Sequence, residues 1–243
     1  MRSVLSFLLL LSVRQLGRLV YHHRADWLGG RPEDWSQIRV IAVLNHTSLY
    51  EPILAGYAPI GLLWRLARHG VLPVAEKTMR RRIGFFFSFL VRHVVVVTRK
   101  RDQTWDRVMN HVDDRALVVI LPEGRMKRRD GLDSSGQPMS IRGGIADILS
   151  VLDQGKLLVV YSGGLHHIQA PGELMPRMFR NLHARLEVLD IPTYRNYLLS
   201  DSTADSFKAA TIRDLTWRRD TFCPEESSFP PLPDDVQLPP LLR

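Results

Sequence analysis

Apolar runs alternate along this chain with segments whose apolar residues recur at helical spacing. Several runs are rich in β-branched residues and nearly continuous, as expected for strands covered on both faces. This alternation is typical of an α/β fold. We predict strands at 39–44, 60–66, 94–98, 116–121, 157–161 and 184–189, and helices at 51–57, 77–91, 102–112, 143–154 and 201–218.

The N-terminal segment is apolar but short. The run VLSFLLLLSV at 4–13 lies between Arg2 and Arg14, whereas about 20 apolar residues are needed to span a bilayer. Cations, histidines and aliphatic residues then mix as far as Arg24, a pattern typical of a helix that lies in the membrane interface. We therefore expect residues 1–30 to form a helical, membrane-associating segment. A helix of the protein core is one alternative. A signal peptide is another, although no small-x-small cleavage site follows the run.

The rest of the chain is predicted to form one folded domain at 31–220 and a tail at 221–243. With 243 residues, the chain is long enough for a single α/β domain with a substantial core. From Pro224 the tail reads PEESSFPPLPDDVQLPP. This proline-rich, acidic composition favours an extended or disordered segment.

The charge balance favours anionic partners. The formal net charge is +8 and the isoelectric point is about 10.0, which suits nucleic acids, anionic membranes and phosphorylated small molecules. Cys223 is the single cysteine, so an internal disulfide is excluded. The sequence has no His/Cys spacing typical of zinc, and no metal site is predicted.

Two polar segments directly follow predicted strands. One reads NHTSLYE at 45–51 and follows the strand at 39–44; the other reads PEGRMKRRDG at 122–131 and follows the strand at 116–121. Ligands in open α/β sheets usually bind beyond the carboxyl ends of the strands. The two segments are therefore the candidate site.

The first segment offers a histidine and a carboxylate. A carboxylate at Glu51 can fix the tautomer of His46, whose free ring nitrogen can then accept a proton from a hydroxyl group. The same glutamate also fits a capping box with Ser48, in which it only bonds the backbone of the cap residue. A third interpretation makes Glu51 the cap and Pro52 the first helical residue.

The second segment offers a tight turn and a cluster of cations. Gly124 allows close approach of a ligand to the backbone. Arginine side chains match the geometry of phosphate oxygens. A solvated basic loop is the alternative. The cations are Arg125, Lys127, Arg128 and Arg129.

Together, the two segments resemble the motifs of the lysophospholipid acyltransferase superfamily, the glycerolipid acyltransferases with a His-x4-Asp motif. The family's first motif usually reads Asn-His-x-Ser-x-x-Asp after a strand, and here it is NHTSLYE. Its third motif reads apolar-Pro-Glu-Gly, and here it is LPEG at 121–124. The motifs occur in the family's order, and the similarity covers roughly residues 35–190. It implies a single-domain glycerolipid acyltransferase fold, with a mixed, mostly parallel sheet flanked by helices.

The sequence departs from the family's pattern at several positions. In the second motif, HVVVVTR at 93–99, Arg99 matches the family's arginine but His93 replaces a glycine. In the fourth motif, at 157–161, Tyr161 stands where a proline is usual. Glu51 replaces the usual aspartate, which preserves a carboxylate on a longer side chain. Arg125 lies one position earlier than the arginine of the common Pro-Glu-Gly-Thr-Arg form.

The resemblance implies an O-acyltransferase with His46 and Glu51 as its catalytic residues. His46 is expected to deprotonate a lysophospholipid hydroxyl, which attacks the thioester of acyl-coenzyme A or acyl carrier protein. The expected acceptor is 1-acyl-glycerol-3-phosphate and the product phosphatidic acid, with no cofactor required. Another lysolipid acceptor and a non-catalytic lipid-binding relative are the alternatives.

The resemblance also assigns the substrate-binding residues. The cations are expected to hold the acceptor's phosphate, and the choice between Arg125 and Lys127 stays open. Glu123 is expected to pair with a cation or an acceptor hydroxyl. The full set is Arg99, Glu123, Gly124, Arg125 and Lys127.

A membrane location follows from this chemistry, because a product with two acyl chains belongs in a bilayer. We expect the protein at the cytoplasmic face of the inner or plasma membrane. The segment RRRIGFFFSFL at 80–90 is a second candidate contact; alternatively, its phenylalanines line the core or an acyl-chain tunnel. We expect no nucleic-acid partner, since no binding module is recognisable.

Overall fold

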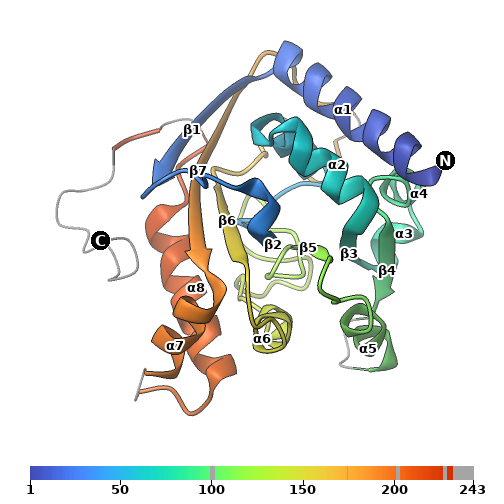
Figure 1. The fold of residues 1–243 in the computed structure, drawn as a ribbon. Helices are drawn as coiled ribbons and strands as arrows, with labels where there is room; N and C mark the ends of the chain where they lie inside the picture. Colours follow the sequence, from blue (N-terminus) through green and yellow to red (C-terminus); the bar gives the residue numbers. More distant parts are fainter. Residues whose placement is uncertain (99–101, 174, 201–202, 227–228, 232–243) are drawn as a thin grey trace.

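The computed structural model describes residues 1–98, 102–173, 175–200, 203–226 and 229–231. Within these ranges the chain forms one sheet with the strand order β1-β7-β6-β2-β5-β3-β4 (Figure 1). β6 and β7 are antiparallel, and the other neighbouring strands are parallel. The predicted α/β fold with a mixed, mostly parallel sheet is confirmed. The strands are β1 (His22–Leu28), β2 (Ile38–Leu44), β3 (Gly70–Ala75), β4 (His93–Val97), β5 (Leu117–Ile120), β6 (Lys156–Ser162) and β7 (Asn181–Asp190).

Helices cover both faces of the sheet (Figure 1). α1, α2, α4 and the 3-10 helix η2 pack over one face, and α5, α6, α7 and α8 pack over the other. The helices are α1 (Arg2–Val20), α2 (Ile60–His69), α3 (Glu76–Met79), α4 (Arg82–Phe87), α5 (Gln103–Met109), α6 (Gly144–Ser150), α7 (Ile191–Leu199) and α8 (Phe207–Phe222), with 3-10 turns η1 (Trp35–Gln37) and η2 (Glu51–Tyr57).

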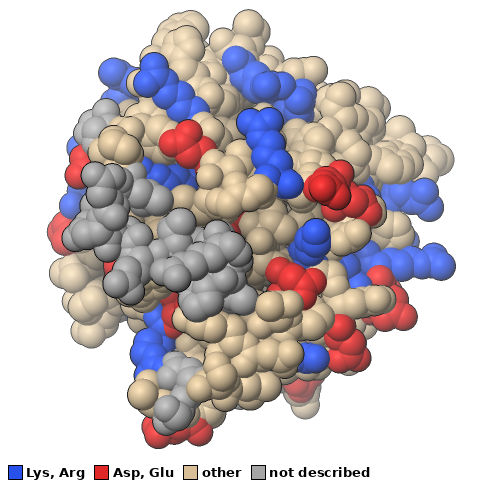
Figure 2. Space-filling model, turned by 60° about the vertical axis from the view of Figure 1, so that its left-hand side comes forward, with Lys and Arg blue, Asp and Glu red and all other residues tan. Residues whose placement is uncertain are grey.

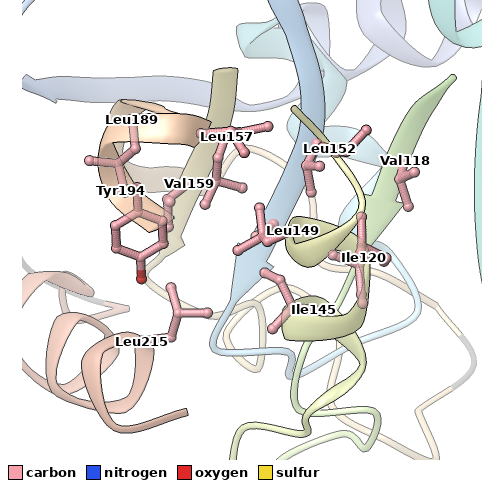
Figure 3. Close-up of a cluster of buried hydrophobic side chains, with 14 of the residues drawn as sticks. Val118, Ile120, Ile145, Leu149, Leu152, Leu157, Val159, Leu189, Tyr194 and Leu215 are labelled. Carbon is pink, nitrogen blue, oxygen red and sulfur yellow. The ribbon is translucent and has the colours of Figure 1, made fainter. Parts of the chain in front are cut away.

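Strand β2 lies at the centre of the sheet and is buried along its whole length. Its side chains alternate between the two faces, so Ile41 and Val43 join the cluster under α1 and α2 while Ala42 and Leu44 join the cluster around α6. This double burial explains the unbroken apolar run. In Figure 3, Ile145 and Leu149 of α6 point toward side chains of the sheet and of α7 and α8.

The prediction of a strand at 60–66 is wrong. These residues open α2, and their buried positions Leu62, Leu63 and Leu66 follow helical spacing. The helix ends at Gly70, where a side chain would place its Cβ 2.3 Å from the carbonyl oxygen of Leu66. The strand that belongs here, β3, begins at that glycine and was not predicted.

Other predicted elements differ in their ends. The 77–91 segment forms two short helices, α3 and α4, with a break at Arg80 and Arg81. After the break Gly84 lies against Met79, where a Cβ would be 2.3 Å from the Met79 carbonyl oxygen. Helix α8 begins later than expected, after Ser206, whose hydroxyl caps it by accepting from Ala209 N–H. Residues 22–28, expected within the helical N-terminal segment, form β1 and pair in parallel with β7.

Helix α1 is the one helix among the described residues that is long and apolar enough to cross a membrane, judged by length and composition. It buries Ser6, Leu10 and Gly17 toward the protein. At Gly17 the backbone comes close to Ile53 of η2, since a Cβ there would lie 3.5 Å from the Ile53 oxygen. The opposite face of α1 stays exposed, including Leu19, which is 77% exposed.

The described part of the tail lies against the domain. Glu226 accepts a hydrogen bond from the backbone N–H of His166 at 2.9 Å, and Phe229 stacks on His183.

Candidate active site

The loop that carries His46 turns sharply as it leaves β2. Asn45 has a φ of 64°, the left-handed region that asparagine tolerates better than most residues. Its side-chain amide donates to the Ser162 carbonyl at the end of β6, at 2.9 Å. The turn therefore holds the following His46 at the carboxyl edge of the sheet.

The imidazole of His46 lies against a buried carboxylate. The Nδ1 atom is 3.0 Å from Oε1 of Glu51, which is only 8% exposed. The oxygen lies off the axis of a ring N–H, so the contact is a close ionic pairing and not a linear hydrogen bond. Such contacts often tighten only when substrate is bound. The other ring nitrogen, Nε2, is the one left to exchange a proton with a substrate.

Glu51 also fixes the loop around the histidine. Its Oε1 accepts from the backbone N–H groups of Thr47 at 3.0 Å and Ser48 at 2.9 Å. The bond to Ser48 is the one expected in a capping box. Neither predicted cap forms, since η2 begins at Glu51 itself with Tyr50 as its N-cap and without a side-chain cap. The same oxygen nevertheless both accepts from Ser48 N–H and pairs with His46. The longer glutamate reaches all three partners.

Glu123 holds the same loop from the turn that follows β5, the strand next to β2. Its carboxylate is 1% exposed and accepts from the backbone N–H groups of Asn45 and His46, both at 2.8 Å. Arg219 of α8 lies 4.0 Å from it. Gly124 follows with a φ of 61°, a conformation that favours glycine. The structure thus gives Glu123 a role in positioning the loop.

The electrostatics of the pair suit a proton acceptor. Burial opposes the protonated form of His46, but Glu51 and then Glu123 outweigh it, so the pKa of His46 is raised. Burial also raises the pKa of Glu123, although its two backbone hydrogen bonds favour the ionised form.

The three predicted phosphate-binding cations have different outcomes. Arg125 forms a salt bridge with Asp133, whose carboxylate is 1% exposed, and also donates to Ser135. Lys127 is held through its backbone: its N–H donates to the His46 carbonyl at 2.8 Å. Arg99 lies outside the described residues.

A large cavity adjoins His46 and Glu51. Its volume is about 1690 Å³, beyond the usual range of roughly 300–1,000 Å³ for small-molecule pockets. Both residues line it. Its apolar part extends between the sheet and the helices α1, α2 and α4, and residues of α5, α6 and α8 line it as well. The apolar part is lined by Leu10 of α1, Leu62 and Leu66 of α2, Phe87 of α4, Val160 of β6 and Leu186 of β7, among others.

The polar part of the cavity carries several cations. Arg125, Arg129 and Lys208 line it, but each has an acidic partner within 4.0 Å. Within the described ranges, the lining cations with no carboxylate at ion-pair distance are Lys77, Arg81, Arg128 and Arg142. Sequence reasoning missed Arg142 as a site residue. Its side chain lies over the third motif, 3.7 Å from where a Cβ of Gly124 would be.

Tyr161, which replaces the proline of the fourth motif, points away from the cavity. It is fully buried in the cluster on the opposite face and donates to Glu187, which also pairs with Arg218 of α8. The neighbouring Leu158 and Val160 face the cavity instead. The substitution therefore leaves the cavity wall apolar.

His166 links the loops of the site. Its Nε2 lies 2.8 Å from the Lys127 carbonyl, and the preceding Leu165 N–H donates to the Thr47 hydroxyl at 2.7 Å. Gln169, in the same turn, accepts from the Ser48 hydroxyl. No group of three His, Cys, Asp or Glu side chains in the described part of the chain is arranged to hold a metal ion.

Comparison with known proteins found no matching family model and no matching curated protein.

Proposed function

We propose that this protein is an acyltransferase that moves a fatty acyl group from a thioester to the hydroxyl of a lysophospholipid. One observation carries the proposal: a histidine paired with a buried carboxylate lines a cavity that is apolar along most of its length and cationic near the histidine. The apolar part suits an acyl chain and the cationic part suits a phosphate. The motif resemblance supports the same conclusion.

The proposed reaction uses His46 and Glu51 as follows. Nε2 of His46 takes the proton of the acceptor hydroxyl while Glu51 balances the imidazolium charge. The oxygen attacks the thioester carbonyl carbon and forms a tetrahedral intermediate. The carbon–sulfur bond then breaks, and the imidazolium proton passes to the leaving thiolate. The products are an ester and a free thiol.

The acceptor is proposed to be 1-acyl-glycerol-3-phosphate. Among the lining cations without a carboxylate at ion-pair distance in the described ranges, Arg142 and Arg128 are proposed to hold its phosphate because they lie nearest the histidine loop. Arg142 lies over Gly124, and Arg128 follows Lys127, whose N–H donates to the His46 carbonyl. Arg125 instead braces its loop through Asp133. The proposed phosphate contact is therefore Arg142, which lies over the PEGR segment, and not Arg125 within it.

Membrane association is part of the proposal. α1 exposes an apolar face, and its buried face contributes Leu10 to the cavity. A lysophospholipid could thus pass from the bilayer into the cavity without crossing water. The active site is proposed to face the cytoplasm, where acyl thioesters are made.

The test is thiol release from acyl-coenzyme A by the purified protein, with and without 1-acyl-glycerol-3-phosphate. We expect acceptor-dependent release, and His46→Ala should lower it by roughly 10²- to 10⁴-fold, the usual share of a general base. His111→Ala, an exposed histidine outside the cavity, is the matched control and should leave the rate unchanged. Absence of release with either a coenzyme A or a carrier-protein donor would refute the proposal.

A further inference from the structure

A second, smaller pocket lies where α1 meets β1. Its volume is about 510 Å³, and it shares no lining residue with the cavity at His46. Its ionisable lining groups are cations, histidines and one tyrosine, and no carboxylate of the described residues lines it. The lining is Arg18, Tyr21, His22, His23, Arg24 and Asn181.

The positive charge of this pocket is not neutralised within the described chain. No carboxylate there lies within ion-pair distance of Arg18 or Arg24. The neighbouring groups respond to the unbalanced charge. Burial and then Arg18 lower the pKa of Arg14, and the pKa of His23 is lowered by burial, with Arg18 and Arg14 acting in the same direction. Arginines without a partner in a concave site suit a phosphate group.

Exposed apolar side chains lie on the segments next to the pocket. On α1, Leu16 is 60% exposed and Leu19 is 77% exposed. A loop that ends at β7 adds Met178 at 57% and Phe179 at 69%. The backbone N–H of Phe179 donates to the Val20 carbonyl at 3.0 Å, so this loop is fastened to the end of α1.

The backbone of this loop is strained. Phe179 has a φ of 57°, which is uncommon for a bulky side chain and costs roughly 1–3 kcal/mol. The fold therefore holds a large aromatic ring out in solvent in an unfavourable conformation, beside other exposed apolar residues. Apolar side chains flanked by cations are typical of a surface that inserts into the membrane interface.

The surrounding surface is rich in cations. Figure 2 shows lysine and arginine side chains across the upper part of the molecule, the level at which α1 lies in Figure 1, with acidic groups among them. Asp26, two residues after Arg24 on β1, is also exposed. Lysine, arginine and acidic side chains are interspersed lower down (Figure 2).

We propose that this pocket binds the phosphate group of an anionic phospholipid while the apolar residues around it insert into the same leaflet. Arg18 and Arg24 would hold the phosphate, and Leu19 and Phe179 would enter the acyl region. A soluble phosphate compound would explain the cations but not the exposed apolar rim. The inference rests on the membrane location in the proposed function and not on acyl transfer.

The binding mode has a consequence for α1. A headgroup held at Arg18 fixes the carboxyl end of the helix at the membrane surface, and the helix stays packed on α2. α1 would then lie along the leaflet with Leu5, Leu8, Leu16 and Leu19 toward the lipid.

The test is sedimentation of the full chain with vesicles of phosphatidylcholine alone or mixed with phosphatidylglycerol. Each arginine near the surface should contribute about fivefold to partitioning onto anionic vesicles. The double variant Arg18→Gln with Arg24→Gln should therefore bind about 25-fold more weakly. Phe179→Ser should weaken binding to both kinds of vesicle. None of these residues lines the cavity at His46, so acceptor-dependent thiol release from micellar substrate should be unchanged.

Matched controls lie at the other end of the molecule. The double variant Arg107→Gln with Arg115→Gln removes the same charge on and after α5, and Leu199→Ser removes a residue of α7 that is 61% exposed. Both should bind like the wild type. The proposal is overturned if the control arginines matter as much as the pocket arginines, or if Phe179→Ser behaves like Leu199→Ser. It is also overturned if inorganic phosphate alone shifts the NMR signals of His22 to saturation while the protein does not bind anionic vesicles. That result would assign the pocket to a soluble ligand.

Discussion

The carboxylate of Glu123 is predicted to act by holding the backbone of the histidine loop, and Glu123→Gln tests this role. In the wild type, two oxygens accept two N–H groups, from Asn45 and His46, at 2.8 Å each. The amide of glutamine has the same shape but only one acceptor. Its NH2 group would face a backbone N–H, so one donor of the loop would lose its partner.

The magnitude follows from this count. A hydrogen bond to a charged group contributes about 1.5–3 kcal/mol, and a buried donor left without a partner costs about 1–3 kcal/mol. Removing the charge offsets part of this free-energy cost, because burial disfavours the ionised carboxylate and raises the pKa of Glu123. A net cost of about 2–3.5 kcal/mol on the loop conformation lowers the fraction of competent enzyme about 30- to 300-fold.

The assay is acceptor-dependent thiol release, analysed for kcat and KM separately. We expect kcat to fall 30- to 300-fold with KM for the acceptor nearly unchanged, because the loop and not the substrate is affected. Asp153→Asn makes the same change of group at a side chain that is 92% exposed and serves as the control. A rise in KM with kcat preserved would contradict the reasoning and assign Glu123 to substrate binding. Activity within threefold of the wild type would refute the clamp altogether.

Four further predictions follow from the structure. In Glu51→Gln, only the weaker effect of Glu123 still opposes burial, so the raised pKa of His46 should fall and the acidic limb of the activity profile should move to lower pH; an unmoved limb would contradict the pairing. Arg142→Gln should raise KM for 1-acyl-glycerol-3-phosphate at least tenfold, by analogy with a lost charge-assisted bond of about 1.5–3 kcal/mol, whereas an unphosphorylated monoacylglycerol should not respond. Arg218→Met leaves the fully buried Glu187 without its cation and should cost about 3–5 kcal/mol in urea unfolding; a loss under about 1 kcal/mol would contradict this. Leu62→Phe adds volume to the cavity wall and should reduce turnover of the longest acyl donors more than that of short ones; equal loss at every length would place the chain elsewhere.

The sequence predicted the layers of the fold better than the individual elements. Continuous apolar runs such as β2 reveal strands buried on both faces. The run at 60–66 was misassigned because its length suits either a strand or the start of a helix. Strand β1 escaped prediction because its residues are only partly buried and its partner, β7, lies far along the chain.

The candidate site was predictable in its residue types but not in its pairings. The motif spacing brought His46, Glu51 and Glu123 to one edge of the sheet. No sequence pattern indicated that Arg125 pairs with Asp133 or that Arg219 approaches Glu123 from α8, because both contacts depend on the packing of side chains from different segments. The sequence motifs therefore located the site. Only the tertiary structure distinguishes a cation that is free to bind phosphate from one that is paired with a carboxylate of the protein.

The sequence also could not decide between the capping and the catalytic interpretation of Glu51. Both were visible in the sequence as competing explanations. One oxygen contacts both Ser48 N–H and His46 Nδ1, although the N-cap of η2 is Tyr50 and neither predicted cap forms. The Glu51 carboxylate thus holds the loop and pairs with His46 at the same time. The histidine is therefore already positioned for proton transfer.

The central claim is that an acyl group passes directly from a thioester to a lysophospholipid with His46 as the base. The most direct measurement supplies acyl-coenzyme A with an isotope-labelled acyl chain and 1-acyl-glycerol-3-phosphate, and follows the lipids by mass spectrometry. The account predicts labelled phosphatidic acid with the wild-type protein and almost none with His46→Ala. The account is contradicted if the label appears only in free fatty acid. It is also contradicted if the protein binds the lysophospholipid but leaves the acyl-coenzyme A unreacted.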